Sequence, residues 1–276
     1  MRYRNILCTY AGDSPRPVGL THAARIAAEN DGWLTAVLRH GTPRLETCYA
    51  TRLPASVISA LHEADDQLIA QARERFQKVV AESGLSDRAT FVELDAEQGE
   101  SLSDFVRTFD LIVCTLGAER PNEAHLAARP DTIALNSGRP VLVVPNESDG
   151  AARPDHVLIA WDGKRAAARA VGDVLPMLDA GSRVSLLTVG RKEQGRNDPL
   201  AGVLQWLTRH GIAVETIHEE GDRRSVPEII LETAVARGAG LVAMGAFEHS
   251  RLSQEIWGGV TSGMLQSASR PILMSH

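Results

Sequence analysis

The chain contains an internal repeat, because apolar and amphipathic segments follow one another in the same order in its first and second halves. Phe109-Asp-Leu-Ile-Val-Cys in the first half parallels Ala239-Gly-Leu-Val-Ala-Met in the second. Ser137-Gly-Arg-Pro-Val-Leu-Val-Val likewise parallels Ala268-Ser-Arg-Pro-Ile-Leu-Met-Ser. Solenoid repeats have periods of roughly 20–50 residues. A unit that fills half of the chain therefore predicts a duplicated domain, with one fold present in two copies.

Each half carries short apolar runs that alternate with amphipathic stretches, the pattern of βαβ units around a parallel sheet. In the first half we expect strands near Asn5–Tyr10, Trp33–Arg39, Ala89–Leu94, Leu111–Thr115 and Val141–Pro145. In the second half we expect them near His156–Ala160, Arg183–Val189, Ala213–His218, Leu241–Gly245 and Ile272–Ser275. The runs are continuous rather than alternating, so helices are expected on both faces of each sheet.

Helices fit between these strands. The clearest spans about Ala55–Glu82, where apolar residues recur at helical spacing, and Gly84 follows it as a C-terminal stop. In the second half, helices are expected near Arg165–Asp179, Pro199–His210, Val226–Arg237 and Gly259–Ser267. The fold class is therefore α/β, with two tandem five-stranded, doubly wound parallel-sheet domains.

A polar stretch that contains glycine and proline separates the two copies. We expect a first domain at 1–146, a linker at 147–155 and a second domain at 156–276. The last strand of each copy is apolar and would be an aggregation-prone sheet edge if left open. The two copies are therefore expected to pack as an internal pseudo-dimer that pairs Val141–Val144 with Ile272–Met274.

Composition narrows the function classes. The net charge of −6 argues against a nucleic-acid partner, because nucleic-acid binders usually carry a basic face. No apolar stretch approaches the roughly 18 residues that span a bilayer, and no signal peptide opens the chain, so we expect a soluble cytoplasmic protein without a membrane partner. Cys8 and Cys114 lie in strand runs and are expected to act as small hydrophobes. Cys48 lies in a polar loop.

The most informative segment follows the fourth strand of the second half. Open α/β sheets bind ligands beyond the carboxyl ends of their strands. Gly245 allows a sharp turn there and lets a ligand approach the backbone. Gly258 and Gly259 open the last helix, whose N-terminus suits phosphate. Polar residues His249, Ser250 and Arg251 lie between Gly245 and this helix, and Val260 and Thr261 stand in its first turn. The spacing alone fits equally a loop whose glycines serve only turn geometry.

This segment resembles the signature of the universal stress protein superfamily, Gly-x2-Gly-x9-Gly-Ser/Thr, which lines the ATP phosphates in nucleotide-binding members. Gly245 fits its first position and Gly258 its third. The phrases His-Ser-Arg-Leu and Gly-Gly-Val-Thr and the ending Pro271-Ile-Leu-Met-Ser-His are typical of tandem bacterial members. The resemblance implies an adenine nucleotide α-hydrolase-like fold and a role in the stress response.

The resemblance also implies base and ribose contacts. Nucleotide-binding members use an acidic residue just after the first strand and backbone groups after the second. Those positions correspond here to Asp162, beside Trp161, and to Thr188 and Val189. The alternative for Asp162 is a turn residue before Gly163, a common role of Asp-Gly.

Two departures from the signature weaken the site. Glu248 stands where the second glycine belongs, and Gly259 replaces the serine or threonine. Repulsion between the glutamate and phosphate is expected to weaken binding roughly tenfold to a hundredfold. The first half has lost more, because Ala11 stands at the position of the acidic residue and only Gly117 matches the signature.

The resulting hypothesis is a stress-response protein that binds an adenine nucleotide, AMP or ATP, in its second domain, with Mg²⁺ only if ATP is bound. The alternative is a scaffold that has lost ligand binding and acts through protein contacts. No convincing general base or metal-ligand set accompanies the signature, so catalysis is not expected. A homodimer of the whole chain is compatible with the sequence.

Overall fold

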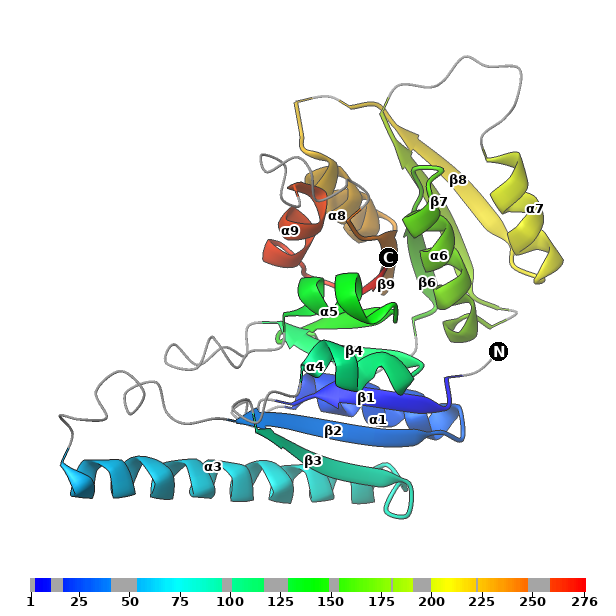
Figure 1. The fold of residues 1–276 in the computed structure, drawn as a ribbon. Coiled ribbons are helices and arrows are strands. Elements are labelled where there is room, and N and C mark those ends of the chain that lie inside the picture. The colour runs from blue at the N-terminus through cyan, green and yellow to red at the C-terminus, as the bar shows by residue number, and fades with distance from the viewer. Residues whose placement is uncertain are drawn as a thin grey trace. The chain divides into compact units, whose positions relative to one another are not determined.

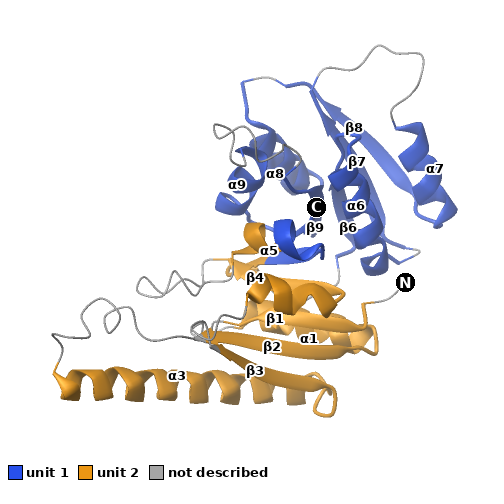
Figure 2. Ribbon diagram, in the orientation of Figure 1, with its two compact units in different colours: residues 1, 134–143, 152–276 blue, residues 2–133, 144–151 orange. Residues whose placement is uncertain are grey.

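The computed structural model contains two compact units (Figure 2). Unit 1 comprises Met1, Ala134–Val143 and Ala152–His276, and unit 2 comprises Arg2–Ile133 and Val144–Ala151. Unit 1 thus holds the second repeat together with ten residues, 134–143, from the first. The structure describes residues 3–10, 17–40, 54–95, 101–116, 129–148, 154–179, 181–190, 200–221, 223–247 and 259–276.

The first repeat follows the expected alternation of strands and helices (Figure 1). Its elements are β1 (Asn5–Thr9), α1 (Val18–Glu29), β2 (Trp33–His40), α3 (Ala55–Glu82), β3 (Ala89–Asp95), α4 (Leu102–Phe105), a 3-10 turn (Val106–Thr108), β4 (Leu111–Leu116), α5 (Pro130–Ser137) and β5 (Val141–Pro145). Within unit 2 the strands lie in the order β3-β2-β1-β4, and all three neighbouring pairs are parallel.

The second repeat has the same plan. Its elements are β6 (His156–Ala160), α6 (Arg165–Val174), a 3-10 turn (Leu175–Met177), β7 (Arg183–Val189), α7 (Ala201–Arg209), β8 (Val214–Glu219), α8 (Val226–Ala236), β9 (Leu241–Gly245), α9 (Gly259–Gln266) and β10 (Ile272–Ser275). Its strands lie in the order β10-β9-β6-β7-β8, all parallel. The predicted fold class is confirmed.

The last strands of the two repeats pair antiparallel inside unit 1. Ile272 lies opposite Val143, Leu273 opposite Leu142, and Met274 opposite Val141. All six residues are at most 3% exposed. The predicted pairing of the two apolar edges is confirmed, since each covers the backbone groups that the other would leave open.

Small differences from the predicted boundaries have local causes. The helix expected to reach Asp179 ends as α6 at Val174, and a 3-10 turn continues to Met177. Pro176 lies in that turn and has no N–H for an α-helical hydrogen bond. α3 spans the predicted residues Ala55–Glu82, and Gly84, two residues beyond its end, has a φ of +67°, the left-handed conformation typical of the residue that follows a helix C-cap.

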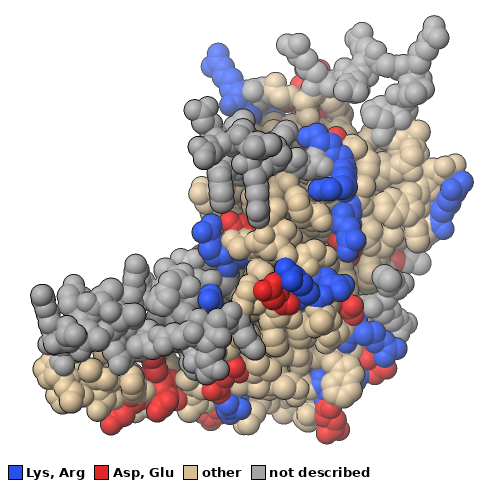
Figure 3. All heavy atoms as spheres, in the orientation of Figure 1, with Lys and Arg blue, Asp and Glu red and all other residues tan. Residues whose placement is uncertain are grey.

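Half of α3 lies outside the hydrophobic core. The helix has 28 residues, and its buried residues are Ala72, Phe76, Val79 and Val80. None of residues 55–71 is buried. The charged side chains of that first half are all acidic, and Figure 3 shows acidic side chains along this helix. The first half of α3 is therefore an exposed, acidic, amphipathic helix.

The two described cysteines are core residues, as predicted. Cys8 and Cys114 are both buried and free. Burial raises the pKa of the Cys114 thiol to about 12 and raises the pKa of Cys8 further still. Thr9 is the register partner of Cys114, so Cys8 and Cys114 point to opposite faces of the sheet. Cys48 lies outside the described residues.

A close crossing between a helix and a strand recurs in both repeats. A Cβ built on Gly245 in β9 would lie 2.6 Å from the Ala167 nitrogen in α6. In the first repeat the corresponding strand position is Thr115 in β4, and there the glycine is Gly19 in α1, where an added Cβ would meet the threonine hydroxyl. In both repeats a glycine allows the first helix to pack closely against the fourth strand. The glycine lies on the strand in the second repeat and on the helix in the first.

Candidate functional site

The strand order of the second repeat reverses beside β6. The chain passes from β6 to β7 and β8 on one side and then crosses to β9 and β10 on the other. Right-handed crossovers consequently place α6 and α7 on one face of the sheet and α8 and α9 on the opposite face. Doubly wound sheets bind ligands outside the carboxyl ends of the strands at such a switch point. A ligand site is therefore expected where β6, β7 and β9 end.

One row of residues crosses this carboxyl edge on the face covered by α6: Ser275, Gly245, Trp161, Thr188 and His218. Trp161 joins the row because its N–H donates to the Leu187 carbonyl at 2.8 Å, which continues the register of Ala160 by one residue. Ser275, Thr188 and His218 of this row are polar, whereas the preceding residue of each strand, one position closer to the core, is apolar. It marks the level at which the hydrophobic interior ends.

The end of β7 offers an open backbone edge. The Leu187 carbonyl bonds toward β6, and the Gly190 N–H bonds toward β8, donating to the Glu219 carbonyl at 2.9 Å. Backbone directions alternate along a strand, so the N–H and C=O of Val189 point toward β6. β6 has already ended at Ala160, and no backbone hydrogen bond within the described residues engages Val189 on that side. A donor and an acceptor therefore lie side by side at the switch point.

Asp162 forms the turn between β6 and α6. Its Oδ1 accepts a hydrogen bond from the Lys164 backbone N–H at 3.0 Å, and its Oδ2 lies 3.7 Å from the Lys164 ammonium nitrogen. Gly163, between them, has a φ of +78°. This is the turn role that the sequence left open as an alternative. The carboxylate is still half exposed, with 52% of the side chain accessible, so the turn does not bury it.

The structure adds a packing requirement for glycine at position 245, which the sequence did not predict. The sequence suggested that the missing Cβ lets a ligand approach. The Cβ position is instead filled from α6, by the Ala167 nitrogen at 2.6 Å and by Ala166 atoms at 2.7 and 2.9 Å. Helix packing requires glycine at this position whether or not a ligand binds.

The start of α9 is divided between exposed and buried positions. Gly259 is exposed, and a Cβ built there would meet no atom within 4 Å, so the hydroxyl side chain of the family signature would fit. Val260 is 36% exposed, whereas Thr261 is 4% exposed and packs inward. Gly263 contacts Pro227 of α8 so closely that a Cβ would lie 2.8 Å from the ring. α9 is thereby fixed against α8.

Several predicted site residues cannot be placed. His249, Ser250, Arg251 and Gly258, together with the obstructing Glu248, lie outside the described residues. Ala11 and Gly117, which were expected to mark the degenerate site of the first repeat, also lie outside the described residues. Their roles remain predictions from the sequence.

Two ring nitrogens at the carboxyl edge are buried without a hydrogen-bond partner among the described residues, Nε1 of Trp161 and Nε2 of His218. The other ring nitrogen of His218 lies 2.9 Å from the Thr188 hydroxyl. From the sequence, His218 was expected only as the last residue of the strand Ala213–His218. Its pairing with Thr188 needed the β7–β8 register, which no sequence pattern specified.

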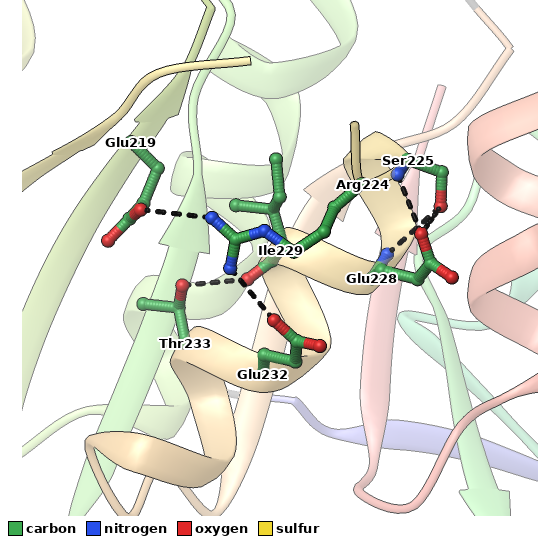
Figure 4. A network of polar contacts seen from close by, with 7 residues as sticks. All are labelled: Glu219, Arg224, Ser225, Glu228, Ile229, Glu232 and Thr233. Carbon is green, nitrogen blue, oxygen red and sulfur yellow. Dashed lines mark hydrogen bonds and ion pairs between the residues drawn. The ribbon is translucent and has the colours of Figure 1, made fainter. Parts of the chain in front are cut away.

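A polar network stiffens the connection after β8 (Figure 4). Arg224 lies between Glu219 at the end of β8, at 3.6 Å, and Glu232 of α8, at 2.8 Å. Ser225 and Glu228 form a capping box at the start of α8. Arg224 therefore places a cation beside the strand residue that pairs with Val189.

Neither a cluster of metal-ligating side chains nor a helix that could span a membrane occurs in the described ranges. No group of three or more His, Cys, Asp and Glu side chains gathers there as a metal site. Among the same residues, no helix combines the length and apolar character needed to cross a membrane.

The sequence and the fold are both similar to those of known proteins. The profile described as the Universal stress protein family matches residues 154–276. Universal stress protein Slr1230 from Synechocystis sp. is 26% identical over 226 residues, which cover 77% of this chain and 72% of the relative.

Solved structures share the fold over almost the whole length. A universal stress protein from Archaeoglobus fulgidus DSM 4304 has a TM-score of 0.71 and 14% identity, covering 99% of this chain and 97% of that one. Protein PA1789 from Pseudomonas aeruginosa PAO1 has a TM-score of 0.58 and 16% identity, covering 99% and 92%. Residues 154–276 thus match the universal stress protein family, and the chain as a whole shares its fold with these solved structures.

Proposed function

We propose that the second repeat binds an adenine nucleotide at the switch point between β6, β7 and β9, and that this binding is how the protein serves the stress response of its family. The observation that carries the proposal is the open donor–acceptor pair of Val189. Adenine presents an amino donor beside a ring-nitrogen acceptor. One strand residue whose N–H and C=O point the same way can therefore pair with the base edge.

The ribose and phosphates would lie toward α9. The half-exposed Asp162 carboxylate stands at the same crevice and can accept hydrogen bonds from ribose hydroxyls. In the family signature Gly258 corresponds to a position that lines the phosphates, and His249, Ser250 and Arg251 precede it in the sequence as further candidate phosphate ligands. Glu248 opposes charge at that end, so base and ribose should dominate the affinity. Mg²⁺ would enter only with ATP.

A proline substitution tests the base edge directly. Val189→Pro removes the N–H that faces the crevice and leaves the hydrogen bonds toward β8 intact, and proline is tolerated where a strand N–H is not in the ladder. One hydrogen bond is worth roughly 0.5–1.5 kcal/mol, so adenosine affinity should fall about tenfold. Val189→Ala is the matched control, because it keeps the N–H and should bind like the wild type.

Isothermal titration of adenosine, AMP and ATP into the full chain and both variants gives the measurement. Equal affinities for Val189→Pro and Val189→Ala would remove the base edge from the site. If the wild type binds no adenine nucleotide, the scaffold function replaces the nucleotide function. The exposed first half of α3 is the observation that favours a scaffold, because an amphipathic helix outside the core is available to another protein.

A further inference from the structure

The apolar face of α3 continues from the core into the first half of the helix. In the second half this face is buried, and its Phe76 ring lies 5.5 Å from the Phe91 ring of β3. Residues three and four apart lie on one face of a helix. Counting back from the buried Ala72 in such steps reaches four half-buried residues, Leu68, Asp65, Leu61 and Ile58. These four residues, three of them apolar, form the α3 stripe.

The first half of α3 extends past the strands of unit 2. Figure 1 shows α3 running beyond the ends of β2 and β3. The Arg73 guanidinium lies 4.8 Å from the centre of the Phe91 ring, so β3 contacts the helix where its second half begins. Before that contact none of residues 55–71 is buried, and Val57 is 41% exposed. An amphipathic helix gains most of its stability by packing its apolar face, and in the described residues the α3 stripe is only half covered.

Asp65 determines which kind of helix can cover the α3 stripe. In a parallel pair of first halves Asp65 would face Asp65, and in an antiparallel pair it would face Leu61 or Leu68. Either arrangement buries a carboxylate against a like charge or against apolar side chains, which is costly. The other charged residues of the first half, Glu63 and Asp66, are acidic too and add repulsion. The complementary occupant is therefore a helix of another protein that brings a cation to the level of Asp65.

We infer that the first half of α3 binds an amphipathic helix of a partner protein, which places one Arg or Lys against Asp65. Residues 55–71 form about 25 Å of helix, or roughly five turns. That length accommodates two heptads of a partner whose apolar residues pack between Ile58, Leu61 and Leu68. Asp65 fixes the register, as a single polar residue in an apolar seam does. Nucleotide binding by the second repeat plays no part in this contact, because α3 belongs to the first repeat.

Two fluorescent peptides of about 18 residues test the contact with the full chain. They share an amphipathic heptad sequence with leucine in the seam and differ at one central seam position, which is Arg in one and Glu in the other. By fluorescence anisotropy the wild type should bind the Arg peptide at least about tenfold more tightly than the Glu peptide. Asp65→Lys should reverse this preference, whereas Asp66→Lys, the control with the same net charge, should keep it. Leu61→Ser should weaken both peptides about tenfold, and Ala60→Ser, outside the α3 stripe, should leave both affinities within about twofold.

Binding that ignores Asp65 would overturn the inference. The wild type would then bind neither peptide or both equally, or Asp66→Lys would reverse the preference as Asp65→Lys does. If sedimentation velocity shows a wild-type dimer that Leu61→Ser dissociates, a second copy covers the α3 stripe and the partner helix is wrong. Residues 65 and 66 are not buried, so both lysine variants should fold and decide the question even if Leu61→Ser does not. Adenosine binding is measured separately, and its absence would leave this contact standing.

Discussion

Replacing Gly245 by alanine should destabilise unit 1 even with no ligand present. The added Cβ would lie 2.6 Å from the Ala167 nitrogen, 2.7 Å from the Ala166 carbonyl carbon and 2.9 Å from the Ala166 Cβ. Ordinary carbon contacts lie near 3.5–4.0 Å, so each contact is short by roughly 0.6–1.4 Å. Two of the three atoms belong to the helix backbone and cannot rotate away. The first turn of α6 would have to move as a whole.

Such overpacking costs typically 1–3 kcal/mol. Alanine also restricts the unfolded chain, which returns about 0.4–1 kcal/mol. The contact is with backbone, so we take the upper end of the cost and expect a net loss of about 2 kcal/mol. With an m-value near 2 kcal/mol/M, the urea midpoint should fall by about 1 M.

Urea unfolding of the ligand-free protein, followed by tryptophan fluorescence, provides the assay, because Trp161 and Trp206 both report on unit 1. Gly259→Ala is the matched control, since its Cβ would enter open space; its midpoint should stay within about 0.3 M of the wild type. A Gly245→Ala protein as stable as this control would refute the packing argument. Loss of ligand binding at full stability would show instead that the glycine serves the ligand.

Three further outcomes are expected. Gly19→Ala should destabilise unit 2 by about 1–3 kcal/mol, and adding Thr115→Gly should recover part of the loss in a urea double-mutant cycle; strict additivity would contradict the shared contact. Glu248→Gly should strengthen ATP binding by about 1–3 kcal/mol and should strengthen AMP binding less. If calorimetry shows no gain in ATP affinity, Glu248 does not repel the phosphates. Cys8 and Cys114 should not react with a thiol reagent in the native protein at pH 8, where their raised pKa values keep them protonated, and should react after unfolding. Rapid labelling of either in the folded state would contradict their burial.

The strands were predictable to within one or two residues because most of them, such as β5 and β6, are continuous apolar runs bounded by polar residues. The 28-residue helix α3 was predictable in full from its periodicity and from Gly84. The early end of α6 was missed, although Pro176 carried the signal, because its apolar neighbours continued the helical pattern. The pairing of β5 with β10 followed from the need to cover two apolar edges.

The site was less accessible to sequence reasoning. Val189 was reached only through the family resemblance, because the direction of its N–H depends on a register that composition does not encode. The packing of Gly245 against α6 was not predicted, since a glycine in a sequence does not show whether a helix or a ligand occupies the space beside it.

Unit 1 contains residues of both repeats, and this affects what happens when the second repeat is produced alone. A cut in the predicted linker would separate β10 from residues 141–143, which supply its antiparallel neighbour. The isolated second repeat would then present an uncovered apolar strand, and the simplest replacement is the same strand of another copy, so the fragment should be a concentration-dependent dimer. Fusing residues 134–143 back onto that fragment should return it to a monomer.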